Sequence, residues 1–169
     1  GIDYVGTGTL VAPQWILTAG HNFYVADEQT SPAKASGIQV YVGNDPNSIQ
    51  QGLLVEKLVF YPTWISDNDG FFYGNDLCLV KLKDPINNIT PALINYSKDE
   101  LIGSIVWFGS FGDYTQQVGQ DANLLPKKNA LQNVLDRKVD GIMTSINGKS
   151  YSGGLIAFDF NTPEGTVNS

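Results

Sequence analysis

The chain has 169 residues, of which 42% are hydrophobic and 16% charged, a composition typical of one folded domain. Ten basic and 17 acidic side chains give a formal net charge of −7, which disfavours binding to the phosphates of nucleic acids. No apolar run approaches the ~18 residues of a membrane-spanning helix, and no signal peptide is visible. We therefore expect neither nucleic acid nor a membrane as a partner.

Short apolar runs alternate with turn-forming clusters along the whole chain, which favours an all-β fold. Eighteen glycines and eight prolines lie scattered among these runs, as in proteins with many turns. This rhythm of short strands and turns is what a β-barrel requires. The strands that we expect cover Thr9–Val11, Trp15–Thr18, Ile38–Gly43, Leu53–Tyr61, Leu77–Leu82, Ile105–Gly109 and Gly154–Phe160.

The chain contains a single histidine, His21, at the exit of one of these apolar runs. The segment Gly8–His21 reads GTLVAPQWILTAGH, and its small residues Thr18–Gly20 leave room for other groups to approach the imidazole. An unperturbed imidazole titrates near pH ~6.5, so it can take up and return a proton at neutral pH. His21 is therefore a candidate general base, and the alternative is a histidine satisfied within a turn.

A second segment places an aspartate at the start of another apolar run. Asn75–Leu82 reads NDLCLVKL, and Asp76 follows His21 in chain order with several expected strands between them. Together the two segments resemble the histidine and aspartate motifs of trypsin-like (chymotrypsin-fold) serine peptidases, and Gly148–Pro163 resembles the stretch before the nucleophile loop in the bacterial secreted type. Those motifs read W-[IV]-L-T-A-[AG]-H and N-D-[IL]-A-L-[LIV]-[KR]-L. Taken alone, Asp76 is equally well interpreted as a turn aspartate beside a strand.

The resemblance implies the trypsin-like double antiparallel β-barrel, an all-β fold. It assigns His21 the role of general base and Asp76 that of the acid that accepts the imidazole N–H, as in the Ser-His-Asp constellation for which this family is the template. We expect an imidazole nitrogen of His21 to lie within hydrogen-bond distance of the Asp76 carboxylate. The implied activity is that of a secreted, extracellular or periplasmic serine endopeptidase, with protein or peptide substrates and no cofactor.

The family's nucleophile motif, G-D-S-G-G, is absent from the chain. The segment YSGG around Ser152 comes nearest, but Tyr151 stands where the family has aspartate, and Leu155 where it has proline. Few residues follow this segment, too few for the remaining strands of a second barrel. Ser152 is therefore interpreted as a turn serine, and we expect the nucleophilic serine outside this chain.

The resemblance also implies that the chain is a partial peptidase domain. The nucleophile motif would lie downstream of Ser169, and the family's first strand would precede Gly1. On this interpretation residues 1–169 form a trypsin-like domain with the first barrel at about 1–100 and part of the second at about 101–169.

The single cysteine excludes an internal disulfide. Secreted members of the family often bridge the strand before the histidine turn to the residue after the histidine. The corresponding positions hold Gly6 and Asn22, so both halves of that bridge are missing together. Cys78 stands where the family usually has alanine, and we expect its thiol to be buried and unreactive.

Local pattern and family resemblance disagree over Lys127–Val139. Apolar residues in this segment recur at helical spacing, which taken alone predicts a helix. The family has a strand there, opening the second barrel. We expect the strand, because it would find barrel partners. The apolar residues concerned are Ala130, Leu131, Val134, Leu135 and Val139.

Metal sites are not expected. The acidic residues that could suggest calcium lack the spacing of a calcium-binding loop, so they are interpreted as solvated. A chain with one histidine and one cysteine offers few ligands for zinc. The acidic residues considered are Asp27, Glu28, Asp67 and Asp69.

Two functions of other classes stay open. The chain could be a non-catalytic peptidase homologue that acts as a binding module, or a fragment completed by a second chain that carries the serine. Nothing structural demands both His21 and Asp76 at these positions, so their presence argues against the binding module.

Overall fold

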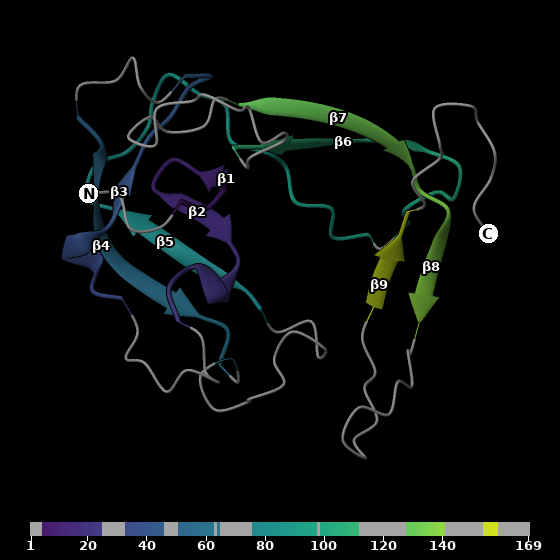
Figure 1. The fold of residues 1–169 in the computed structure, drawn as a ribbon, viewed down its shortest axis with the longest axis horizontal. Helices are drawn as coiled ribbons and strands as arrows, with labels where there is room; N and C mark the ends of the chain where they lie inside the picture. The colour runs from purple at the N-terminus through teal and green to yellow at the C-terminus, as the bar shows by residue number, and fades with distance from the viewer. Residues whose placement is uncertain are drawn as a thin grey trace, which may run out of the picture.

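The computed structural model describes residues 5–24, 33–45, 51–62, 64, 76–97, 99–111, 128–140 and 154–158. Within these residues it contains nine β-strands and two 3-10 turns, η1 (Gly20–Asn22) and η3 (Ala35–Gly37). The strands form one five-stranded sheet and two antiparallel pairs (Figure 1). The expectation of an all-β fold is confirmed.

The five-stranded sheet has the strand order β1-β2-β5-β4-β3, and every neighbouring pair is antiparallel. β5 therefore lies between β2 and β4, although β2 comes from the start of the chain. The strands match the expected apolar runs, except that β3 is shorter than its run. Their bounds are β1 (Thr9–Ala12), β2 (Trp15–Thr18), β3 (Gln39–Val40), β4 (Leu53–Phe60) and β5 (Cys78–Leu82).

The core of this sheet is built by alternate residues of its central strand. Cys78, Val80 and Leu82 of β5 are at most 2% exposed, while the residues between them are half-buried, as the period of two in a strand requires. Val80 lies opposite Ile16 of β2, and Leu82 opposite Val55 of β4. One face of the sheet therefore packs as a continuous apolar layer.

The other face of β4 and β5 holds two lysines directly opposite each other, Lys57 and Lys81. Like charges at such a pair repel unless other groups compensate. Lys81 Nζ lies 2.8 Å from a carboxylate oxygen of Glu56, and this hydrogen-bonded lysine lowers the pKa of the Glu56 carboxyl. Lys57 Nζ lies 5.8 Å from the ring centre of Trp15. Each lysine thus has its own partner.

The rest of the described chain forms two antiparallel pairs. β6 (Ile105–Ser110) pairs with β7 (Asn129–Val134), and β8 (Arg137–Asp140) pairs with β9 (Gly154–Ala157). In Figure 1, β6 and β7 lead from the five-stranded sheet towards β8 and β9 on the other side of the molecule. The last run is shorter than expected, since β9 ends at Ala157 and residues 159–160 lie outside the described part.

Of the segment with helical spacing, residues 128–139 are described and contain strands instead of a helix, so the expectation of a strand is confirmed there, and Lys127 lies outside the described residues. It forms two strands, β7 and β8, with a break at Leu135, which is 2% exposed. The backbone N–H of Leu135 donates to the carbonyl oxygen of Ser104, and the carbonyl oxygen of Leu135 accepts the N–H of Gly103. The loop that precedes β6 therefore holds the chain at this break. Strand pairing with β6 and β9 outweighs the local helical pattern.

No helix within the described residues is long and apolar enough to cross a membrane.

Cys78 is buried, as expected, with 1% of its surface exposed. Burial raises the pKa of its thiol to about 11, because the thiolate loses its hydration, and a backbone hydrogen bond at Val59 lowers the pKa in part.

A thiol reagent should therefore react with the native protein very slowly at pH 8. Only the thiolate is nucleophilic, and at this pKa it is a trace species even before access is considered. Labelling should become fast and stoichiometric in denaturant, and a Cys78→Ala variant should not label at all. Rapid labelling of the folded protein would contradict the burial of Cys78.

Candidate active site

His21 follows directly from the end of a core strand. After Thr18 closes β2, Ala19 keeps an extended backbone and η1 then turns the chain. The turn is closed by two backbone hydrogen bonds to Gly20 O, from the N–H groups of Phe23 and Tyr24. His21 is the middle residue of this single turn, so its position is set by the strand before it.

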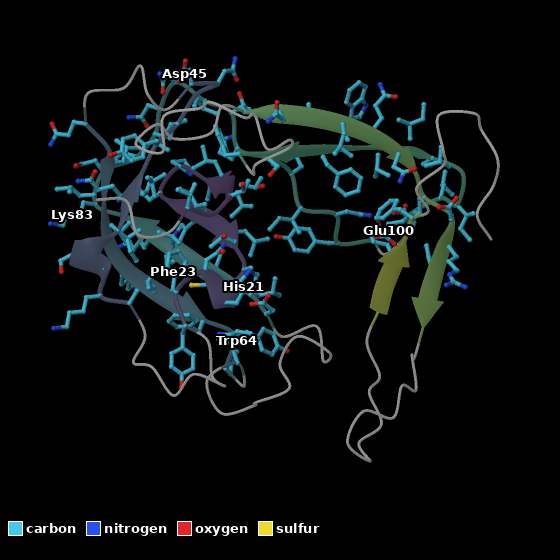
Figure 2. All side chains as sticks on the ribbon, in the orientation of Figure 1. His21, Phe23, Asp45, Trp64, Lys83 and Glu100 are labelled. Carbon is cyan, nitrogen blue, oxygen red and sulfur yellow. The ribbon has the colours of Figure 1, made fainter. Side chains whose placement is uncertain are left out.

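Asp76 reaches the same place from the opposite direction. The antiparallel register pairs Thr18, the last residue of β2, with Cys78, the first residue of β5. The chain leaving β2 and the chain entering β5 therefore meet at one end of the sheet. Figure 2 shows His21 at this end, far from Asp45 and Glu100.

The Asp76 carboxylate contacts His21 twice. One oxygen, Oδ2, lies 2.6 Å from the ring atom Nδ1, and the other, Oδ1, accepts the backbone N–H of His21 at 2.8 Å. The His21 and Asp76 side chains are 35% and 18% exposed, so the pair is partly shielded from water. One carboxylate thus fixes both the backbone and the ring of the same residue.

This contact selects one form of the imidazole. An ionised carboxylate has no proton to donate, so Nδ1 carries the proton in the Nδ1–Oδ2 hydrogen bond. In neutral histidine the lone pair is then on Nε2, the nitrogen that would accept a proton. The arrangement can therefore present Nε2 as a proton acceptor while the carboxylate holds the ring.

A sequence model of the family named Trypsin matches residues 2–145. The chain belongs to the trypsin family. The five-stranded sheet and the additional strand pairs accordingly form a chymotrypsin-type β-barrel fold, one of whose barrels is incomplete in the described structure.

Individual relatives agree with this family. The chain is 32% identical over 89 residues to complement C1s subcomponent of Rattus norvegicus, and 32% identical over 82 residues to complement C1s-1 subcomponent of Mus musculus. It is 29% identical over 112 residues to the glutamyl endopeptidase of Bacillus licheniformis. These matches cover 48%, 47% and 64% of this chain but only 12%, 11% and 33% of the relatives.

A solved structure of a Glu endopeptidase in complex with MPD shares the fold of this trypsin-family chain. The TM-score is 0.62 with 17% sequence identity, over 94% of this chain and 74% of the other. Identity at this level supports the fold alone.

A tryptophan beside the histidine turn was not predicted from the sequence. Trp64 is 2% exposed and packs on Gly20, and Figure 2 shows it at the same end of the sheet as His21. A Cβ on Gly20 would lie 2.8 Å from Trp64 Nε1 and 2.9 Å from Cδ1. The absence of a side chain on Gly20 therefore creates the space that the indole fills.

The other candidates from the sequence lie outside the part of the chain that the structure describes. Ser152 lies outside the described residues, as do Asn75 and the four acidic residues considered for calcium. Within the described ranges no three His, Cys, Asp or Glu side chains gather into a metal-binding group. A hollow of about 270 Å³ is lined by Val40, Leu53 and Ile86, at the end of β4 remote from His21.

Replacing Gly20 with alanine should destabilise the fold, because the new methyl group overlaps the Trp64 indole. Forcing an extra methyl group into a packed site costs about 1–3 kcal/mol. The matched control is Gly37→Ala in η3, where a Cβ would meet nothing within 4 Å. Urea unfolding of both variants should show a lower free energy of unfolding for Gly20→Ala only. Equal free energies of unfolding for the two variants would contradict the packing of Trp64 on Gly20. Adding Trp64→Leu to Gly20→Ala should recover part of the loss.

Proposed function

We propose that the chain is the part of a serine endopeptidase that carries His21 as general base and Asp76 as its orienting acid. The observation that supports this most is the double contact of one carboxylate with the ring and the backbone of the only histidine. Family membership gives peptidase chemistry in general, and this geometry names the residues that would perform it.

In this proposal His21 removes the proton from a serine hydroxyl through Nε2 while the serine oxygen attacks the carbonyl carbon of a peptide bond. The imidazolium formed is stabilised by Asp76 through the Nδ1–H···Oδ2 hydrogen bond. His21 then passes its proton to the leaving amine, and the C–N bond breaks to give an acyl-enzyme. Water then attacks the acyl-enzyme while His21 takes its proton, and His21 returns this proton to the serine oxygen. The products are the carboxylic acid and the regenerated serine.

The nucleophilic serine in this proposal lies outside residues 1–169, since no residue of the chain carries the family's nucleophile pattern. The first barrel extends over about residues 1–100 and the chain supplies part of the second over about 101–169. Substrates are proteins or peptides, and the enzyme acts outside the cytoplasm. The matched segments span at most a third of the curated relatives, so each of these statements is a proposal about a larger protein.

The competing functions differ in what they require of the site. A binding module has no use for a carboxylate that fixes the tautomer of a histidine, so the contact itself favours catalysis. A fragment completed by a partner chain uses the same two residues, and it differs only in where the serine is encoded.

Replacing Asp76 with asparagine in the complete peptidase should lower turnover by roughly 10⁴-fold, the effect known for the template Ser-His-Asp triad of this same family. An asparagine amide would donate to Nδ1 and place the imidazole proton on Nε2, where a base needs a lone pair. Asp84→Asn is the control, because Asp84 is exposed on the loop after β5. Peptide hydrolysis by both variants measures the difference, and comparable losses would contradict the role of Asp76.

Residues 1–169 expressed alone should not react with a serine-directed fluorophosphonate, whereas the complete protein should. A base and its acid without the hydroxyl cannot form the covalent adduct. Stoichiometric labelling of the short chain would place the nucleophile within it, with Ser152 the first position to test. Failure of the folded complete protein to label would favour the binding module.

A further inference from the structure

The residue after His21 is held by side-chain contacts that the proposed mechanism does not use. Asn22 faces Gly6, in the segment that precedes β1. A Cβ on Gly6 would lie 2.8 Å from Cγ of Asn22 and 2.9 Å from both Nδ2 and Oδ1. The Asn22 amide therefore fills the space in which a side chain of residue 6 would sit.

Two hydrogen bonds connect this amide to the backbone before β1. Asn22 Nδ2 donates to Thr18 Oγ1 at 2.8 Å, and Thr18 Oγ1 donates to the carbonyl oxygen of Thr7 at 2.7 Å. The Thr18 hydroxyl has one proton, which goes to Thr7, so it receives the Asn22 proton on a lone pair. Both bonds are partly buried, and each group in the chain of bonds has the donor or acceptor it needs.

The chain of bonds continues to the second part of the molecule. Thr7 Oγ1 accepts the backbone N–H of Phe111 at 3.0 Å and lies 3.5 Å from Ser110 Oγ, at the end of β6. Thr7 thus contacts Thr18 of β2 through its carbonyl oxygen and the end of β6 through its hydroxyl. The turn that carries His21 is tied to both parts of the fold.

The turn needs such an anchor because it is short and its first residue makes no side-chain hydrogen bond. η1 has three residues, and the first of them, Gly20, has no side chain. Asp76, just before β5, holds His21, whereas the side chain of Asn22 holds the following residue through Thr18 and Thr7. Two separate anchors on consecutive residues restrict the motion of the turn.

We propose that Asn22 and Thr18 are positioning residues, a hydrogen-bonded clip that keeps the His21 imidazole aligned with the Asp76 carboxylate. The proposal rests on the proposed function for its catalytic consequence, but the alignment itself can be measured without activity. Neither residue touches the reacting atoms; they act through the backbone of the turn.

The decisive variant is Thr18→Val, which keeps the shape of the side chain and removes the hydroxyl. It should lower kcat of the complete peptidase by roughly 10- to 100-fold with little change in KM, the order of loss expected for a small misplacement of a reacting group. Thr18→Ser restores the hydroxyl and should restore most of the activity. Thr9→Val, the same change at an exposed position of β1, is the matched control and should be neutral.

The spectroscopic readout is the imidazole Nδ1–H proton of His21. In the complete peptidase this hydrogen-bonded proton should give a downfield NMR signal, which is assigned by its loss in a His21→Ala variant. The signal should be sharp in the wild type and Thr18→Ser, and broadened or lost in Thr18→Val and Asn22→Ala. A variant that keeps both the signal and kcat would overturn the clip.

A disulfide that replaces the Asn22 hydrogen bonds tests the clip even where Thr18→Val or Asn22→Ala fails to fold. Gly6→Cys combined with Asn22→Cys should form a disulfide with oxidised glutathione, which takes up the two electrons and two protons, and the buried Cys78 should not compete. The oxidised protein should recover the NMR signal and activity, and reduction should lower both. Recovery that is equal in both redox states would overturn the proposal. If the complete protein is inactive but the signal responds as described, the proposed function fails and the clip stands.

Discussion

The pairing of β2 with β5 is the constraint on which the candidate site depends. Its register puts Thr18 opposite Cys78, so the residues just beyond both strands meet at one end of the sheet. A shift by one residue would turn every side chain of a strand to the opposite face and move Val80 out of the core. Burial of the core therefore also fixes the meeting of His21 and Asp76, although neither belongs to the core.

In the proposed function, Asp76 combines a structural and a chemical role in one carboxylate. Its two oxygens hold the backbone N–H and the ring N–H of His21, and each hydrogen bond to a charged group contributes roughly 1.5–3 kcal/mol in proteins. An asparagine at this position could still accept the backbone N–H through Oδ1. It would lose only the oxygen that accepts the Nδ1 proton of the ring. The tautomer of His21 would therefore change while the turn is retained.

The strands and the two motif residues could be predicted because their signals are local. The apolar runs of β2 and β5 are both readable along the chain. The helical spacing around β7 and β8 was misleading, since only pairing with distant strands decides against a helix. Likewise nothing in the sequence signals that Trp64 packs on Gly20. The same holds for the hydrogen bonds from Asn22 to Thr18 and from Thr18 to Thr7. Those contacts join segments whose approach depends on the complete fold.

The way the histidine turn is held has a consequence for folding. A disulfide stabilises mainly by restricting the unfolded chain, typically by about 2–4 kcal/mol, and it requires an oxidant. Hydrogen bonds such as Asn22–Thr18 and Thr18–Thr7 act only in the native state and contribute roughly 0.5–1.5 kcal/mol each. The turn therefore reaches its geometry without oxidation, at lower total stability. With Cys78 buried in the core, the folded chain also exposes no thiol that could pair wrongly.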